Sequence, residues 1–147
     1  MRPLNAVFLI ALLAMSTTAS AQNDAPTSSP ASCPSPSQIT PLHLYGLWRA
    51  EFEGQAQGAT VLFERHPELS GSVSGGVNRN GAKALVAGDV DNGEFTLEES
   101  SDGQRITATW LGKVVENSCG KEIRGTWHKD STQTSYPFVL RKVPGWQ

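Results

Sequence analysis

Turn-forming residues recur at intervals of about ten residues between Ile39 and Gln147, and this spacing constrains the fold more than any other feature. Pairs such as Asn80-Gly81 and Asn92-Gly93 supply the positive φ angles that tight hairpins need. The stretches between these breaks show no period of 3.6 residues. They predict eight strands: Leu44–Glu53, Ala59–Arg65, Leu69–Asn78, Ala82–Val90, Glu94–Glu99, Gln104–Val115, Glu122–His128 and Tyr136–Val143.

Apolar and polar side chains alternate along several of these predicted strands. In the first, Trp48 and Phe52 share one face, whereas Arg49 and Glu51 share the other. The same rule groups Phe95 with Leu97, Ile106 with Ala108 and Trp110, and Ile123 with Gly125 and Trp127. Alternation of this kind is typical of strands that bury one face and expose the other.

Eight strands joined by short hairpins favour an all-β, antiparallel, up-and-down β-barrel. An open sheet of that length would leave two unpaired edges and a wet apolar face, and closure removes both problems. A two-sheet sandwich is the alternative fold. The interior of an eight-stranded barrel is just wide enough to be filled by side chains or to hold one small ligand.

The N-terminus has the pattern of a secretory signal peptide over residues 1–21. A short positive start at Met1-Arg2 precedes the apolar stretch from Ala6 to Met15, and Ala19-Ser20-Ala21 fits the cleavage site. The apolar stretch would cover only ~15 Å of a ~30 Å bilayer core, so it is too short to span a membrane. A lipoprotein needs a cysteine directly after the cleavage point, and Cys33 lies further on. We expect a periplasmic or secreted protein with no membrane span.

Residues 22–38 are rich in proline and serine and predict a flexible linker, followed by the barrel domain over residues 39–147. The chain has two cysteines, Cys33 in the linker and Cys119 in the barrel. Because an oxidising compartment favours paired cysteines, we expect a Cys33–Cys119 disulfide. Two free thiols with a redox role are the alternative, although the chain has no C-x-x-C motif.

Charge and side-chain chemistry exclude several functional classes. The formal net charge is −2, which gives no basic footprint for nucleic acid. No serine lies in a nucleophile elbow, and the carboxylate pairs Asp89/Asp91 and Glu98/Glu99 flank turns, where such groups usually serve solubility. The three histidines lack metal-ligand spacing: His43, His66 and His128. We therefore expect no catalytic residues, no metal site, no cofactor and no enzymatic activity.

Short motifs resemble those of the calycin superfamily, which includes the lipocalins and avidins. Gly46-Leu47-Trp48 is a G-x-W motif on the first predicted strand, where calycins carry theirs. Further along, three segments are similar to avidin strands in order and spacing: Leu69–Val73, Thr107–Trp110 and Gly125–Trp127.

The resemblance implies that Trp48 closes one barrel end and that Arg141, on the last predicted strand, packs across its ring. It thus gives Gly46 and Arg141 structural roles. Avidins hold biotin through hydroxyl and amide groups on their first three strands. This chain instead has Arg49, Ala50 and Glu51 after Trp48, and Val73 where a tyrosine is expected, which argues against biotin.

Small residues on the third and fourth predicted strands would leave volume beside the tryptophans if they point inward. We expect a small apolar or ring-containing ligand, bound in the barrel or at its mouth by these residues: Trp48, Phe52, Val73, Trp110 and Trp127. The alternative is that the small residues only allow the strands to coil, while the tryptophan rings fill the interior.

The sequence thus predicts a non-enzymatic binding protein with two competing partner classes. One is a small molecule at the barrel mouth. The other is a protein, for which the chain would act as an enzyme inhibitor or host-interaction module through its outer surface; exposed aromatics such as Trp146 are common anchors of that kind. A ligand-free scaffold and a homo-oligomer are further alternatives. An internal cavity would favour the small molecule, and a filled barrel with an apolar outer patch would favour the protein.

Overall fold

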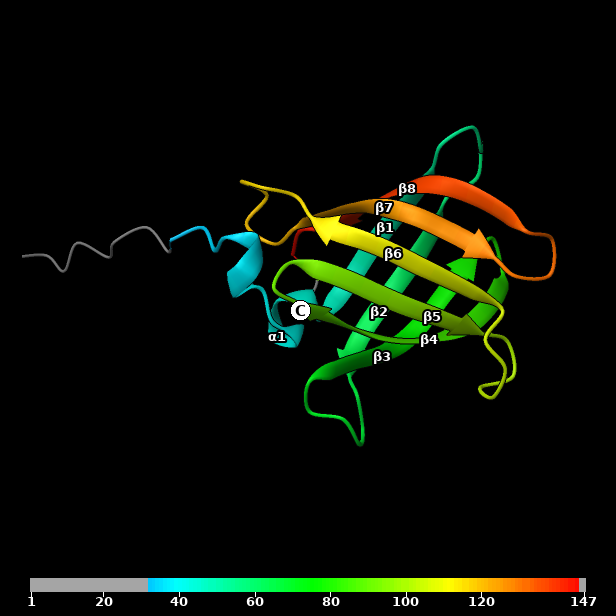
Figure 1. The fold of residues 1–147 in the computed structure, drawn as a ribbon, viewed down its shortest axis with the longest axis horizontal. Coiled ribbons are helices and arrows are strands. Elements are labelled where there is room, and N and C mark those ends of the chain that lie inside the picture. Colours follow the sequence, from blue (N-terminus) through cyan, green and yellow to red (C-terminus); the bar gives the residue numbers. More distant parts are fainter. Residues whose placement is uncertain (1–31, 146–147) are drawn as a thin grey trace, which may run out of the picture. The chain divides into compact units, whose positions relative to one another are not determined.

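Eight antiparallel strands form a closed barrel in which each strand pairs with its neighbours in the sequence and β8 pairs with β1 (Figure 1). This computed structural model describes residues 32–145. The elements are η1 (Pro36–Gln38), α1 (Pro41–Leu44), β1 (Gly46–Phe52), β2 (Ala59–Arg65), β3 (Ser72–Arg79), β4 (Ala82–Asp91), β5 (Glu94–Ser100), β6 (Ala108–Val114), β7 (Glu122–Lys129) and β8 (Thr134–Lys142). The predicted up-and-down barrel is confirmed. The predicted signal peptide lies outside the described residues.

Three predicted strands begin too early. Leu44 belongs to α1, where Pro41 occupies the first turn and Thr40 caps it. Leu69 and Ile106 precede β3 and β6 and are 56% and 41% exposed, so neither belongs to the inward face. Before β6 the reason is local. The Asp102 carboxylate accepts hydrogen bonds from the backbone N–H groups of Gln104 and Arg105 and holds this segment as a turn.

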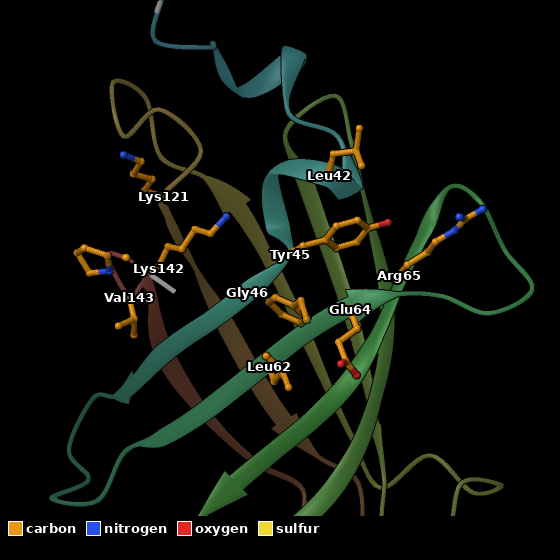
Figure 2. Close-up of a pocket in the computed structure, with 12 residues that line it drawn as sticks. Leu42, Tyr45, Gly46, Leu62, Glu64, Arg65, Lys121, Lys142 and Val143 are labelled. Carbon is orange, nitrogen blue, oxygen red and sulfur yellow. The ribbon is translucent and has the colours of Figure 1, made fainter. Parts of the chain in front are cut away.

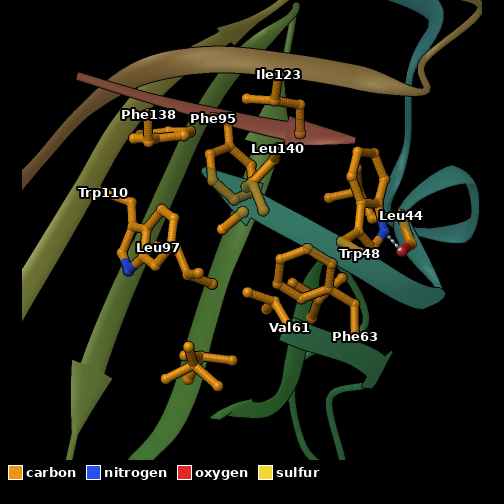
Figure 3. Close-up of a cluster of buried hydrophobic side chains, with 14 of the residues drawn as sticks. Leu44, Trp48, Val61, Phe63, Phe95, Leu97, Trp110, Ile123, Phe138 and Leu140 are labelled. Atoms are coloured by element: carbon orange, nitrogen blue, oxygen red, sulfur yellow. Dashed lines mark hydrogen bonds between the residues drawn. The ribbon is translucent and has the colours of Figure 1, made fainter. Parts of the chain in front are cut away.

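The inward faces of the strands pack into one continuous core. Aromatic rings from different strands meet edge to face, with centroids 6.0 Å apart for Trp48 and Phe63 and 4.9 Å apart for Trp110 and Phe138. Figure 3 shows these rings converging with Leu97, Ile123 and Leu140 inside the barrel. Trp48 and Trp110 have no exposed surface, so side chains fill the centre of the barrel.

Inward glycines explain how the strands approach so closely. A Cβ added at Gly75, Gly88 or Gly125 would collide with a backbone carbonyl of the neighbouring strand. These positions therefore serve strand packing rather than ligand volume, as the second interpretation of the small residues expected.

Gly88→Ala should lower the free energy of unfolding by about 1–3 kcal/mol, because its methyl group would meet the Thr96 carbonyl on β5. Gly71→Ala is the matched control, since no atom of residues 32–145, apart from the two adjacent residues, lies within 4 Å of the added methyl there. Denaturant unfolding of both variants measures the difference. Equal stability of the two would show that the strand spacing adapts to a side chain at Gly88.

The segment before β1 closes one end of the barrel. Ile39 and Leu44 are buried, and the indole N–H of Trp48 donates to the Leu44 carbonyl at 2.7 Å (Figure 3). The predicted disulfide between Cys33 and Cys119 is present and ties this segment to the loop before β7. The last residues of the predicted linker, including η1, thus belong to the folded unit. Among the described residues, no helix is long and apolar enough to cross a membrane.

The cation over Trp48 is Lys142, not the expected Arg141. Lys142 is the β8 partner of Trp48 and lies 6.0 Å from its ring centroid. Arg141 points to the outer surface, where it pairs with Glu51 and Glu122 at 3.1 and 3.5 Å. The side chains of a strand alternate between its two faces, so the adjacent residues Arg141 and Lys142 point outward and inward, respectively. Gly46 has a φ of 119° at the start of β1, a backbone conformation that favours glycine.

Candidate functional site

The barrel end opposite α1 carries an ion pair between a partly exposed arginine and a buried glutamate. This end, called the mouth below, is bounded by the hairpin loops 53–58, 80–81, 101–107 and 130–133. Arg79 is the last residue of β3, and Glu99 lies near the end of β5. Both side chains point inward, because Arg79 follows the parity of Val77 on its strand and Glu99 follows that of Leu97.

Glu99 is 3% exposed, and four donors from three residues bind its carboxylate. Arg79 donates from Nη1 to Oε2 at 2.9 Å and from Nη2 to Oε1. The indole N–H groups of Trp110 and Trp127 both donate to Oε1, at 2.7 and 2.9 Å. A carboxylate taken out of water needs such partners, and here they come from β3, β6 and β7.

Aromatic rings surround the guanidinium of Arg79. Its Cζ atom lies 5.3 Å from the ring centroid of Trp127, 5.6 Å from that of Phe52 and 5.8 Å from that of Trp110. The Arg79 side chain is still 27% exposed, and Arg79 lines the surface pockets at this end of the barrel. Arg79, Glu99, Trp110 and Trp127 are called the mouth cluster below.

A pocket of about 180 Å³ opens beside the mouth cluster and is called the mouth pocket below. Its walls combine aromatic rings, amide side chains and the Arg79 guanidinium: Phe52, Gln55, Gln57, Gly58, Arg79, Trp127 and Tyr136. Tyr136 stacks on Trp127, with centroids 5.9 Å apart and planes 15° from parallel. A wider depression of about 820 Å³ adjoins it and shares Arg79 and Trp127.

The structure brings only part of the predicted ligand site together. Phe52 and Trp127 line the mouth pocket, and Trp110 lies beneath it with its ring 5.3 Å from that of Phe52. Trp48 and Val73 lie in the packed half of the barrel near α1 and are fully buried.

The sequence interpretation missed both members of the ion pair. Glu99 was expected to be a solubilising turn flank, and Arg79 lay just beyond the predicted third strand. Alternation carried the signal: Phe95, Leu97 and Glu99 share one parity, as do Val77 and Arg79. Extending both patterns by one inward position would have placed the two charges inside the barrel.

The opposite end of the barrel also has a depression, of about 720 Å³ (Figure 2). Figure 2 shows Lys121 and Lys142 on one side of the lining residues and Arg65 on the other, with Tyr45 between them. Burial, and to a lesser extent the nearby charge of Lys121, lowers the pKa of the Lys142 amine. Lys142 already donates to the His43 carbonyl at 2.8 Å, so this polar group serves the closure of the barrel. The mouth is the stronger candidate.

Within residues 32–145, no three His, Cys, Asp or Glu side chains are grouped so that they could hold a metal ion. His128 hydrogen-bonds to Ser135 at 2.8 Å, and His43 to the Thr40 hydroxyl at 3.0 Å. These histidines have local structural partners. The side chains that line the mouth pocket carry aromatic rings, amides and the Arg79 guanidinium.

The mouth cluster has to be interpreted on its own chemistry. Comparison of the chain with protein-family models and with curated protein sequences finds no match.

Proposed function

We propose that this chain is an exported, non-enzymatic binding protein that holds a small ring-containing ligand in the mouth pocket. The observation that carries the proposal is the pocket's composition: three aromatic side chains, Phe52, Trp127 and Tyr136, converge with one accessible guanidinium. Ligand pockets in proteins combine apolar walls with a few fixed polar groups in this way. The fold is consistent with the calycin resemblance, and membership in that superfamily is part of the proposal.

The packed interior limits where such a ligand can bind. The core around Trp48 and Phe63 is filled, and the end near α1 is closed by Leu44. At about 180 Å³, the mouth pocket is smaller than the roughly 300–1,000 Å³ typical of sites for drug-sized ligands. It therefore suits a single ring rather than a long acyl chain.

The energetics of the mouth cluster support a binding role. A buried ion pair is often no more stable than apolar residues of the same volume, so stability alone is a weak reason to keep one. Placed beside a pocket, the pair instead fixes a guanidinium at the ligand. Four hydrogen bonds engage the Glu99 carboxylate, so it positions Arg79 and the two indole rings, which fits a binding role. The disulfide is compatible with export to an oxidising compartment.

Titration of the protein with indole, benzoate, biotin and palmitate, followed by tryptophan fluorescence and calorimetry, tests the proposal. We expect saturable binding of benzoate and indole and none of palmitate, because side chains fill the core of the barrel over residues 32–145. Tyr136→Ala should weaken ring binding about tenfold, because it removes a stacking wall.

Tyr45→Ala is the matched control for this test. Tyr45 is the other tyrosine of the chain and lines the depression at the closed end, so its loss should leave ring binding unchanged. Flat titrations with every compound would contradict the proposal. Equal losses in both variants would place the ligand away from the mouth.

A row of apolar side chains on the outer surface favours a second candidate, binding of a partner protein. The row crosses four neighbouring strands, β1 to β4, and each of its residues pairs with the next across the strands: Leu47, Leu62, Gly76 and Leu85. They border a groove of about 390 Å³, and Leu85 is 56% exposed. Exposed apolar patches often mark protein interaction sites. Together with the filled core, this row makes a protein partner the interpretation to pursue if the ring titrations are flat.

A further inference from the structure

Arg79 has an unused hydrogen-bonding edge. Within residues 32–145, its hydrogen bonds run from the two terminal nitrogens, Nη1 and Nη2, to the two oxygens of Glu99. This end-on pairing does not use the Nε–H group or the outer N–H groups of the guanidinium. These donors lie along its other edges. Arg79 lines both the mouth pocket and the wider depression, so these donors are within reach of a bound molecule.

The free edge is held in position before any ligand arrives. The Glu99 carboxylate fixes the guanidinium plane by a two-pronged contact, and the rings of Phe52, Trp110 and Trp127 surround it. A fixed guanidinium suits planar, two-pronged recognition of an oxyanion because little side-chain freedom is lost on binding.

The charges around the mouth favour an anion as well. The wider depression is lined by four cationic side chains, those of Arg79, Lys83, Arg105 and Lys129, against three anionic ones. Arg105 lies 3.9 Å from Asp102, and Arg79 is paired with Glu99. In the described part of the chain, Lys83 and Lys129 have no ion-pair partner. The wider depression therefore has one more cationic than anionic side chain, although the formal net charge of the whole chain is −2.

We infer that the ring ligand of the mouth pocket carries a carboxylate, which the free edge of Arg79 binds while the ring packs against Trp127 and Tyr136. The inference rests on the proposed function and adds the ligand's chemical class. An aromatic acid and a sugar acid share this chemistry, since both present a ring and a carboxylate to stacked aromatic side chains.

Matched acid and neutral compounds test the inference on the wild-type protein. Calorimetry with benzoate against benzamide, and with glucuronate against glucose, keeps each ring and removes its charge. We expect one acid to bind about tenfold more tightly than its neutral counterpart, the size of one charge-assisted hydrogen-bonded contact. The pair that shows the preference identifies the kind of ring.

Arg79→Lys tests the residue. Lysine keeps the positive charge beside Glu99 but loses the planar fork, so the ratio of acid affinity to neutral-ring affinity should fall to about twofold. Arg65→Lys, at the far end of β2, should keep the full preference. Rings that bind equally well with and without the carboxylate would overturn the inference and leave the proposed function standing. An acid preference that survives Arg79→Lys would overturn the role of Arg79, and no ring binding at all would contradict both proposals.

Discussion

Glu99→Leu should lower the free energy of unfolding by about 3–5 kcal/mol, a large change for a single substitution. Leucine is close in size to glutamate, so little packing is lost. The loss comes from the donors left behind: the partly buried Arg79 guanidinium and the indole N–H groups of Trp110 and Trp127 would all lose their acceptor, and Trp110 is fully buried. Urea unfolding of the variant and the wild type measures the change.

Glu98→Leu provides the control on the same strand. Glu98 faces outward and is exposed, so the same substitution should change the free energy of unfolding by less than about 0.5 kcal/mol. Adding Arg79→Met to Glu99→Leu should restore much of the lost stability, because the uncompensated charge is removed. If Glu99→Leu were as mild as Glu98→Leu, the mouth cluster would not be a coupled unit, and the fixed orientation inferred for Arg79 would lose its basis.

Most of the fold could be predicted from alternation and turn chemistry alone. A period of two assigns faces wherever apolar residues mark one side, as for Trp48 and Phe52 on β1 or Phe95 and Leu97 on β5. Asn80-Gly81 and Asn92-Gly93 form the expected hairpin turns, and both asparagines have positive φ angles. Local chemistry was sufficient because each of these features depends on neighbours in the sequence.

The candidate site could be predicted only in part, because its chemistry depends on residues far apart in the chain. A charged residue at an inward position normally argues against burial, and Glu99 is accommodated inside by donors far along the chain, among them Arg79, twenty residues earlier. No periodicity indicates that pairing. The same limit explains why Arg141 was predicted to lie over Trp48 when Lys142 does. The pairing register between β1 and β8 decides which of the two residues faces Trp48.

Removing the disulfide with Cys33→Ser and Cys119→Ser should lower the free energy of unfolding by about 4–5 kcal/mol. The bond closes a loop with a sequence separation of 86, which spans most of the barrel, and the chain-entropy model gives this amount for such a loop. The structural consequence should be local to the closed end. Cys33 holds the segment whose Ile39 and Leu44 cover the core, and Trp48 donates to the Leu44 carbonyl. The near-UV circular dichroism of the tryptophans should therefore weaken before the barrel unfolds.

Reduction of the wild-type protein with dithiothreitol supplies the control for this pair of substitutions. The reductant should bring the wild type down to the stability of the double serine variant and leave that variant unchanged, since it has no thiols. A loss below about 1 kcal/mol would mean that the packing of Ile39 and Leu44 closes the barrel without help from the bond. The disulfide would then secure residues before Ile39 rather than the barrel end itself, and closure by Leu44 and Trp48 would be a property of the apolar contacts alone.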